Sequence, residues 1–95
     1  MAKYFEDNKA AFDKLDQYLP IVERVHGPHH EEIYAVGDTY RDIRSKVEGG
    51  TEDLSGQFEE IRKITNNYAV PNDVCESYEA VYETLEQLDK ANSAR

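Results

Sequence analysis

Apolar residues recur at alternating three- and four-residue spacing in four stretches of this 95-residue chain. That spacing matches the 3.6-residue period of an α-helix with one buried face. The first stripe predicts a helix over about residues 6–26 and ends on an imidazole. Its members are Phe5, Phe12, Leu15, Leu19, Val22 and His26. Pro20 lies inside this pattern and has no backbone N–H, so we expect a kink or a locally broken turn there.

The second stretch predicts a helix over about residues 28–48. Pro28 suits the first helical position, where its missing N–H is not needed. Glu31 and Glu32 then fall in the first turn, where the helix dipole favours anions. Gly49 and Gly50 end the helix. His29 and His30 also lie in this predicted first turn. The apolar stripe, extended backwards by four residues to the first turn, is His29, Ile33, Val36, Tyr40, Ile43 and Val47.

Two further helices are predicted over about residues 52–67 and 72–91. Thr51 is the expected N-cap of the third, followed by acidic first-turn residues. Its stripe is Leu54, Phe58, Ile61, Ile64 and Tyr68. Pro71 lies in the next loop, and the fourth stripe is Val74, Tyr78, Val81, Leu85 and Leu88.

No segment has the alternating pattern of a strand, and the connections are short enough to make neighbouring helices antiparallel. The pattern therefore predicts an all-α fold, an up-down-up-down antiparallel four-helix bundle in which residues 1–95 form a single domain. So small a chain buries a thin core and is expected to be moderately stable unless it dimerises.

The charge restricts the partners. Against 11 Lys and Arg residues stand 20 Asp and Glu residues, which leaves a net charge of -9. Nucleic acid and anionic membranes are poor partners for such a surface, so we expect a protein partner or a homodimer. The single cysteine, Cys75, fits a reducing compartment. No signal-peptide core and no apolar run of about 20 residues is present, which predicts a cytoplasmic protein.

Candidate chemistry gathers in residues 22–33, which hold all three histidines of the chain. One hypothesis is a divalent metal site made by His26, His29 or His30, and Glu31, because imidazole and carboxylate are common metal ligands. The alternative is structural, with His26 bonding the last carbonyls of the first helix. A third hypothesis is a pH-responsive corner, since histidine titrates near neutrality.

Catalytic motifs are missing from the sequence. There is no Ser/His/Asp arrangement, no phosphate-binding loop and no CxxC, so no catalytic residue is assigned and we do not expect an enzyme. Cys75 opens the last predicted helix, and the favoured interpretation is a half-buried packing residue rather than a reactive thiol.

Two stretches carry a family resemblance: PIVERVHG at residues 20–27 and FEEIRKITNNYAVPNDVCESYEAVYETLEQL at residues 58–88. Both resemble the hemerythrin-like domain of the Ric-type di-iron iron–sulfur cluster repair proteins. The second stretch has the motif elements Thr65-Asn66-Asn67, Pro71 and Val74-Cys75 in the family's spacing. The resemblance spans most of residues 5–90 and implies a hemerythrin-like bundle connected with iron–sulfur cluster repair and stress response. The family's separate cysteine-bearing N-terminal domain is not expected here.

In that family two irons lie at one end of the bundle. The ligands are a His early in helix one, a His-x-x-x-Glu ending helix two, a His opening helix three and a His-x-x-x-Glu ending helix four. The corresponding positions here are Phe5, residues 47–50, Thr51 and Arg95, and none holds a histidine. The resemblance therefore implies a shortened form with a degenerate metal site, no ligand by family motif and no expected cofactor.

Three functions remain open. The first is a protein related to cluster repair that lacks its own di-iron centre and acts by protein binding. The second is a metal-binding protein that holds iron or zinc through a dimer interface or through the corner of His26, His29 and His30. The third is a structural adaptor bundle unrelated to iron.

Overall fold

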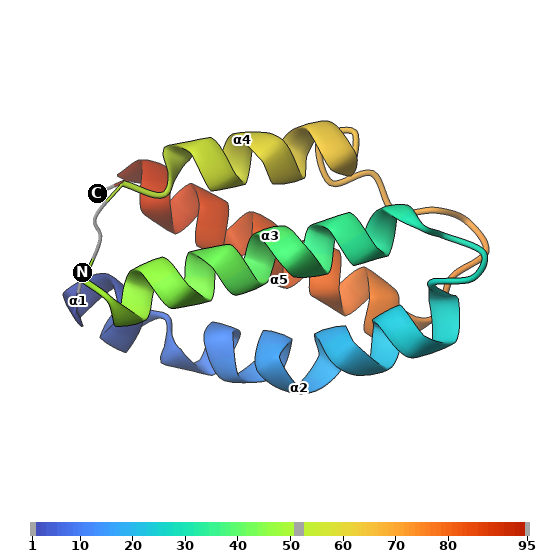
Figure 1. The fold of residues 1–95 in the computed structure, drawn as a ribbon, viewed down its shortest axis with the longest axis horizontal. Helices are drawn as coiled ribbons and strands as arrows, with labels where there is room; N and C mark the ends of the chain where they lie inside the picture. The colour runs from blue at the N-terminus through green and yellow to red at the C-terminus, as the bar shows by residue number, and fades with distance from the viewer. Residues whose placement is uncertain (1, 51–52, 95) are drawn as a thin grey trace.

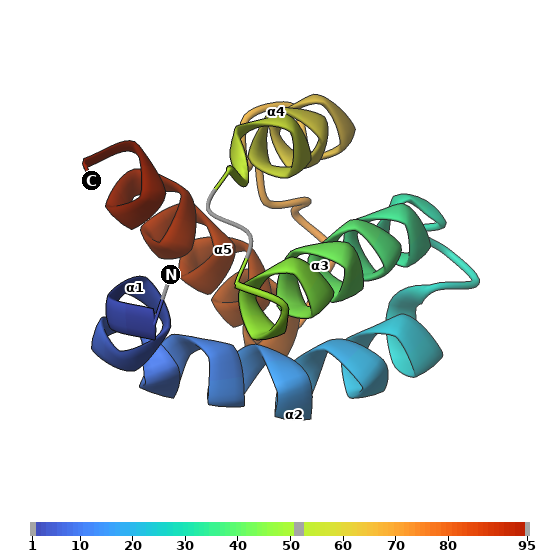
Figure 2. The same ribbon diagram turned by 60° about the vertical axis from the view of Figure 1, so that its left-hand side comes forward.

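The computed structural model describes residues 2–50 and 53–94, and it places five helices and no strand in this part of the chain (Figures 1 and 2). The all-α prediction is therefore confirmed for these residues. The helices are α1 (Ala2–Asp7), α2 (Lys9–His26), α3 (Glu32–Glu48), α4 (Ser55–Ile64) and α5 (Glu76–Ala94).

The first predicted helix is in fact two helices, because a turn at Asn8 separates α1 from α2. The Asn8 side chain donates a hydrogen bond from Nδ2 to the Tyr4 carbonyl oxygen at 2.9 Å. Asparagine interrupts helices in this way because its amide competes for backbone partners. The break lets α1 turn toward the end of α5, where Tyr4 Oη donates to the Leu88 carbonyl oxygen at 2.8 Å.

Pro20 does not break α2, so the expected broken turn was wrong. The helix is continuous from Lys9 to His26, and Pro20 lies on its exposed side. Figure 2 shows α2 as an uninterrupted ribbon that bows around the rest of the molecule. A bow of this kind, with its outer side toward solvent, makes room for the proline ring without ending the helix.

The second predicted helix begins late, because α3 starts at Glu32 and residues 27–31 form the connection. The backbone N–H groups of His29 and His30 both donate to the His26 carbonyl oxygen, at 3.0 and 2.8 Å. Pro28 thus lies in a tight turn and does not open a helix, contrary to the prediction. The two histidines precede α3 instead of forming its first turn.

Helix α4 corresponds to the third predicted helix and is shorter than predicted. It begins at Ser55 and ends at Ile64, whereas the pattern predicted a helix over about residues 52–67. The expected N-cap Thr51 lies outside the described residues. Asp53 Oδ1 accepts a hydrogen bond from the Ser55 N–H at 3.0 Å, so its carboxylate satisfies one of the free donors at the start of α4.

A run of three left-handed residues ends α4. Asn66, Asn67 and Tyr68 have φ values of 52°, 62° and 65°. Asparagine tolerates this region well, but tyrosine does not. Thr65 Oγ1 holds the tyrosine in place by accepting its backbone N–H at 2.8 Å. The backbone then remains non-helical as far as Cys75, so α5 begins four residues later than predicted.

The long helices pack in a closed order: α2 contacts α3 and α5, and α4 contacts α3 and α5. Figure 1 shows that consecutive long helices run in opposite directions. The predicted stripes face this core, where all their apolar members are buried except Phe5, Ile64 and Val74, which are partly buried. Within the described residues, no helix is long and apolar enough to cross a membrane.

Candidate functional site

The end of α2 and the start of α5 bring His26 and Cys75 into contact. His26 Nε2 lies 3.1 Å from Cys75 Sγ, although the two residues are 49 positions apart in the sequence. The thiol is exposed, so the expectation of a half-buried packing residue was wrong. Its neighbour Val74 is the residue that packs against the core, which leaves Cys75 on the outer side of the turn.

His30 lies beside this pair, between two carboxylates. Its Nδ1 is 3.2 Å from Glu32 Oε1, and its Nε2 is 3.1 Å from Asp73 Oδ1. The second contact is an ion-pair distance without hydrogen-bond geometry. The His30 side chain is only 15% exposed. Its contact with Asp73 links the α2–α3 turn to the α4–α5 loop.

The ring of Tyr78 forms the floor beneath both imidazoles. Its centroid lies 5.3 Å from that of His26 and 5.7 Å from that of His30, in edge-to-face arrangements. Its hydroxyl is 3.0 Å from the Tyr82 hydroxyl and donates to Glu32 Oε1 at 3.4 Å. Burial raises the pKa of Tyr78 well above its ordinary value, so this floor is a neutral hydrogen-bonding surface.

We call this group, His26, His30, Asp73, Cys75 and Tyr78, the histidine corner. His29 and Glu31 are exposed and lie outside it. In the described part of the chain, no three His, Cys, Asp or Glu side chains are placed to hold one metal ion. Sequence reasoning identified His26 and His30 but did not connect them with Asp73 and Cys75, because that proximity depends on how α5 packs against α2.

The opposite end of the molecule, where the resemblance places iron ligands, is aromatic. The resemblance puts the first ligand position at or near Phe5, whose ring lies 5.3 Å from that of Phe12. Tyr4 meets Phe12 edge to face at 5.9 Å. The Arg44 guanidinium covers both phenylalanine rings, at 4.9 Å from Phe5 and 5.7 Å from Phe12. We call these four residues the aromatic end.

The second expected ligand position, residues 47–50, serves the helix end. Val47 is buried, and Glu48 pairs with Arg44 at 3.1 Å. The Gly49 N–H donates to the Ser45 carbonyl oxygen at 3.0 Å. Gly50 has a φ of 80°, which glycine adopts without strain. The third and fourth expected positions, Thr51 and Arg95, lie outside the described residues.

A buried carboxylate, Asp89, joins α5 to the end of α4. Arg62 Nη1 donates to both Asp89 oxygens, at 2.7 and 2.6 Å, and Tyr68 Oη donates to Asp89 Oδ2 at 2.8 Å. Only 8% of the Asp89 side chain is exposed. Burial and the Asp89 carboxylate raise the pKa of Tyr68 well above its ordinary value, so the phenol remains a donor. Asp89 lies four residues beyond Leu85 in the stripe, which is the signal that could have revealed its burial.

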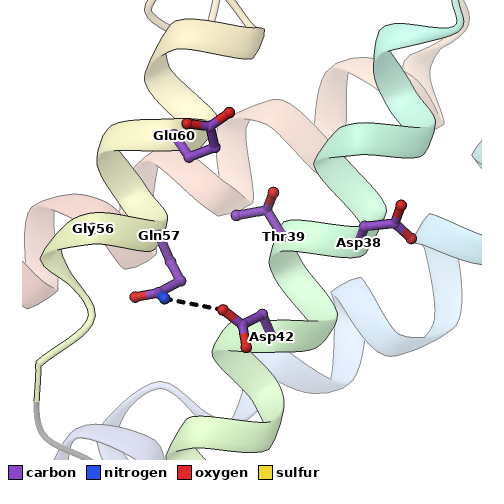
Figure 3. Close-up of a pocket in the computed structure, with 6 residues that line it drawn as sticks. All are labelled: Asp38, Thr39, Asp42, Gly56, Gln57 and Glu60. Carbon is purple, nitrogen blue, oxygen red and sulfur yellow. Dashed lines mark hydrogen bonds between the residues drawn. The ribbon is translucent and has the colours of Figure 1, made fainter.

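A shallow groove runs between α3 and α4 (Figure 3). Gln57 Nε2 donates across it to Asp42 Oδ2 at 2.9 Å. A Cβ added at Gly56 would meet no atom within 4 Å, so the groove is open at that point. The lining residues are Asp38, Thr39, Asp42, Gly56, Gln57 and Glu60.

Comparisons with known proteins point to cluster repair. No family model and no solved structure matches the chain. It is 24% identical over 125 residues to the iron–sulfur cluster repair protein ScdA of Staphylococcus haemolyticus. The aligned region covers 94% of this chain and 55% of that protein. ScdA proteins of two Staphylococcus epidermidis strains are 22% identical over 121 residues, covering 92% of this chain and 54% of theirs.

These similarities establish a distant relationship to the repair proteins. The chain spans about half the length of the relatives it matches. The matched regions, at 125 and 121 residues, are longer than the 95 residues of the chain, so the relatives carry insertions relative to it.

Proposed function

We propose that this chain is a protein-binding relative of the iron–sulfur cluster repair proteins that holds no di-iron centre of its own. The observation that carries the proposal is the aromatic end. The first position where the resemblance expects an iron ligand is Phe5, which packs on Phe12 beneath the Arg44 guanidinium.

This packing disfavours a metal centre for an electrostatic reason. Two iron ions need several inward-facing carboxylates and imidazoles. The described part of this end instead buries phenylalanine, tyrosine and valine, and the Arg44 guanidinium there holds the carboxylates of Asp16 and Glu48 in ion pairs. The matched relatives carry insertions relative to this chain, as a shortened form requires.

The arrangement of helices supports a hemerythrin-like bundle as the scaffold. The closed packing order of α2, α3, α4 and α5 and their alternating directions are those of an up-down-up-down four-helix bundle, with α1 as a short addition (Figure 1). In this proposal the domain spans residues 1–95.

The composition supports the setting of this function. A single cysteine and a net charge of -9 favour a cytoplasmic protein whose partners are proteins with basic surfaces, and disfavour nucleic acid and membranes. A role under oxidative or nitrosative stress follows from the resemblance to the repair proteins.

Metal content and partners test the proposal together. Untagged protein from iron-fed cells is assayed for iron and zinc, with its mass in solution, and is then used to capture partners from cells with and without nitric oxide stress. We expect far less than one iron per chain and capture of iron–sulfur proteins or full-length repair proteins. A bound di-iron centre would overturn the first part. If the captured partners are unrelated to iron–sulfur proteins in both conditions, the proposal is wrong and the structural adaptor function is supported instead.

A second candidate function is metal binding at the histidine corner. His26 Nε2 and Cys75 Sγ are both zinc ligands and lie 3.1 Å apart. Within the described residues no third His, Cys, Asp or Glu side chain joins this pair to hold one metal ion, so a tetrahedral site would need the same pair from a second copy. Zinc titration with measurement of mass in solution tests this, with Cys75→Ser as the variant. A monomer that binds no zinc excludes it.

A further inference from the structure

The groove between α3 and α4 has an opening that the fold itself does not require. Gly27 and Gly37 are close to other side chains, so a Cβ would clash with Tyr34 or Glu23. Gly56 has no such neighbour, and its φ lies outside the left-handed region. Gly56 is the second residue of α4, and neither packing nor backbone geometry within the described residues requires glycine at this position.

The charges around this opening are of one sign. Figure 3 shows the side chains of α3 facing α4 across the groove at Thr39 and Asp42. Asp42 and Glu60 are exposed, and none of the six lining residues is basic. Asp38 and Asp42 lie four residues apart on α3, a spacing at which like charges destabilise a helix. Arg41 compensates Asp38 by an ion pair at 3.0 Å, whereas Asp42 accepts a hydrogen bond from the neutral Gln57 amide.

A metal ion does not fit this groove. In the described part of the chain no three acidic, histidine or cysteine side chains converge on one point. The carboxylates are instead spread along two helices. Extended negative charge beside an open surface suits a chain of basic side chains, whose methylene groups can lie over Gly56 and Thr39 while their charged heads reach the carboxylates.

We propose that this groove is the docking surface for a lysine- and arginine-rich segment of a partner protein. The inference rests on the proposed protein-binding function and names the chemistry of the partner. Gln57 has a positioning role, because its hydrogen bond to Asp42 Oδ2 orients that carboxylate across the groove.

A defined probe tests the groove directly. Uniformly ¹⁵N-labelled protein is titrated with an acetylated, amidated tetra-arginine peptide, and amide shifts are mapped. We expect shifts concentrated in residues 38–42 and 55–60. The double substitution Asp42→Asn and Glu60→Gln should weaken binding by about threefold to tenfold, the sum of two exposed ion pairs.

A matched control distinguishes peptide binding in the groove from attraction to the acidic surface as a whole. Asp13→Asn with Glu83→Gln removes the same two charges from exposed positions on α2 and α5, and binding should hardly change. Gly56→Leu should abolish the localised shifts by filling the groove, while Gly56→Ala should melt no lower than the wild type. Shifts spread over the whole surface, or equal weakening by both double variants, would overturn the proposal.

The natural partner is identified by crosslinking in cells. A photoreactive p-benzoylphenylalanine at exposed Ser55, next to Gly56 on α4, is compared with one at exposed Gln87 on α5. Crosslinks from position 55 to a Lys/Arg-rich segment support the proposal; crosslinks to acidic or neutral segments, to a second copy, or none at all overturn it. If iron–sulfur partners are still captured by Gly56→Leu, the groove fails and the proposed function stands. If the wild type captures none, the proposed function fails, and the peptide titration still decides the groove.

Discussion

The aromatic end and the histidine corner lie at opposite ends of the helices (Figure 1) and differ in the kind of contact that holds them together. At the aromatic end, Phe12 is fully buried among Tyr4, Phe5 and Tyr40. At the histidine corner, polar side chains lie over the buried ring of Tyr78, and Cys75 is exposed. The first end contributes apolar burial, whereas the second links two loops through polar contacts.

The difference shows that a high number of histidines in one region does not by itself locate a metal site. Histidines crowd one end, yet the described residues there provide no group of three metal donors. The resemblance expects ligands at the other end, where aromatic rings pack instead. Both ends include a residue of α2, so one 18-residue helix carries the two environments.

The largest expected effect involves the buried tyrosines and appears in alkaline solution. Burial raises the pKa values of Tyr40, Tyr68, Tyr78 and Tyr82 in the folded protein. The unfolded chain therefore loses these protons first, near pH 10, and stability present below that pH is lost as pH rises. Each such tyrosine removes about 1.4 kcal/mol per pH unit above pH 10.

Urea unfolding between pH 8 and pH 11.5, with tyrosinate absorbance recorded in parallel, measures this loss. Tyr40→Phe and Tyr78→Phe apportion it between the middle of the molecule and the histidine corner, and each should flatten the alkaline decline. A stability that is constant up to pH 11.5 would contradict the buried, hydrogen-bonded state of these phenols.

Phe12→Ala should be the most damaging single substitution at neutral pH. The residue is fully buried and contacts three aromatic rings, so we expect a loss of about 3–5 kcal/mol in the free energy of unfolding. Urea unfolding followed by circular dichroism measures it. Tyr34→Ala, at a residue that is 43% exposed near the other end, is the control and should cost less than about 1 kcal/mol. Equal losses would remove the energetic distinction between the ends.

Asp89→Asn tests the carboxylate that ties α5 to the end of α4. It keeps the side-chain shape but weakens the bonds from Arg62 and Tyr68. We expect a loss of about 1–3 kcal/mol, because a buried polar network becomes only partly satisfied. Glu86→Gln, which removes an exposed pair with Lys90, is the control and should cost less than about 1 kcal/mol. An unchanged unfolding midpoint for Asp89→Asn would show that the network adds nothing to stability.

The smallest expected effect is on the rate at which Cys75 reacts. In thiol–disulfide exchange with Ellman's reagent, the Cys75 sulfur attacks the reagent disulfide and releases one aromatic thiolate. His26 can accept the thiol proton across 3.1 Å, so His26→Gln should slow the folded protein by about tenfold near pH 7. His29→Gln is the matched control, because His29 lies outside the corner. If both variants react like the wild type, the contact has no chemical consequence.

Periodicity located the long helices well because burial is what imposes it. The stripes from Phe12 to Val22 and from Ile33 to Val47 line the core as predicted. Helix ends were harder to locate, since they depend on local competition for hydrogen bonds. Asn8 interrupts the first helix through its own side chain, and the run of left-handed residues after Thr65 ends α4 early.

The candidate site was predictable only in part for a related reason. His26 stood out because it extends an apolar stripe, and His30 because it adjoins other histidines. Their partners could not be found by spacing, because Cys75 and Asp73 follow a non-helical loop whose path is set by packing. The groove at Gly56 was not predicted from the sequence, because it depends on how α3 and α4 pack.

The sequence by itself determined the helical class, the core stripes and the acidic surface, because each depends on which side chains leave water and on the sum of charges. Tertiary structure alone decided which side chains meet. It paired His26 with Cys75, buried Asp89 against Arg62 and Tyr68, and opened the groove at Gly56. The physical reason is that the hydrophobic effect is not directional, whereas these contacts depend on how the helices are positioned against one another.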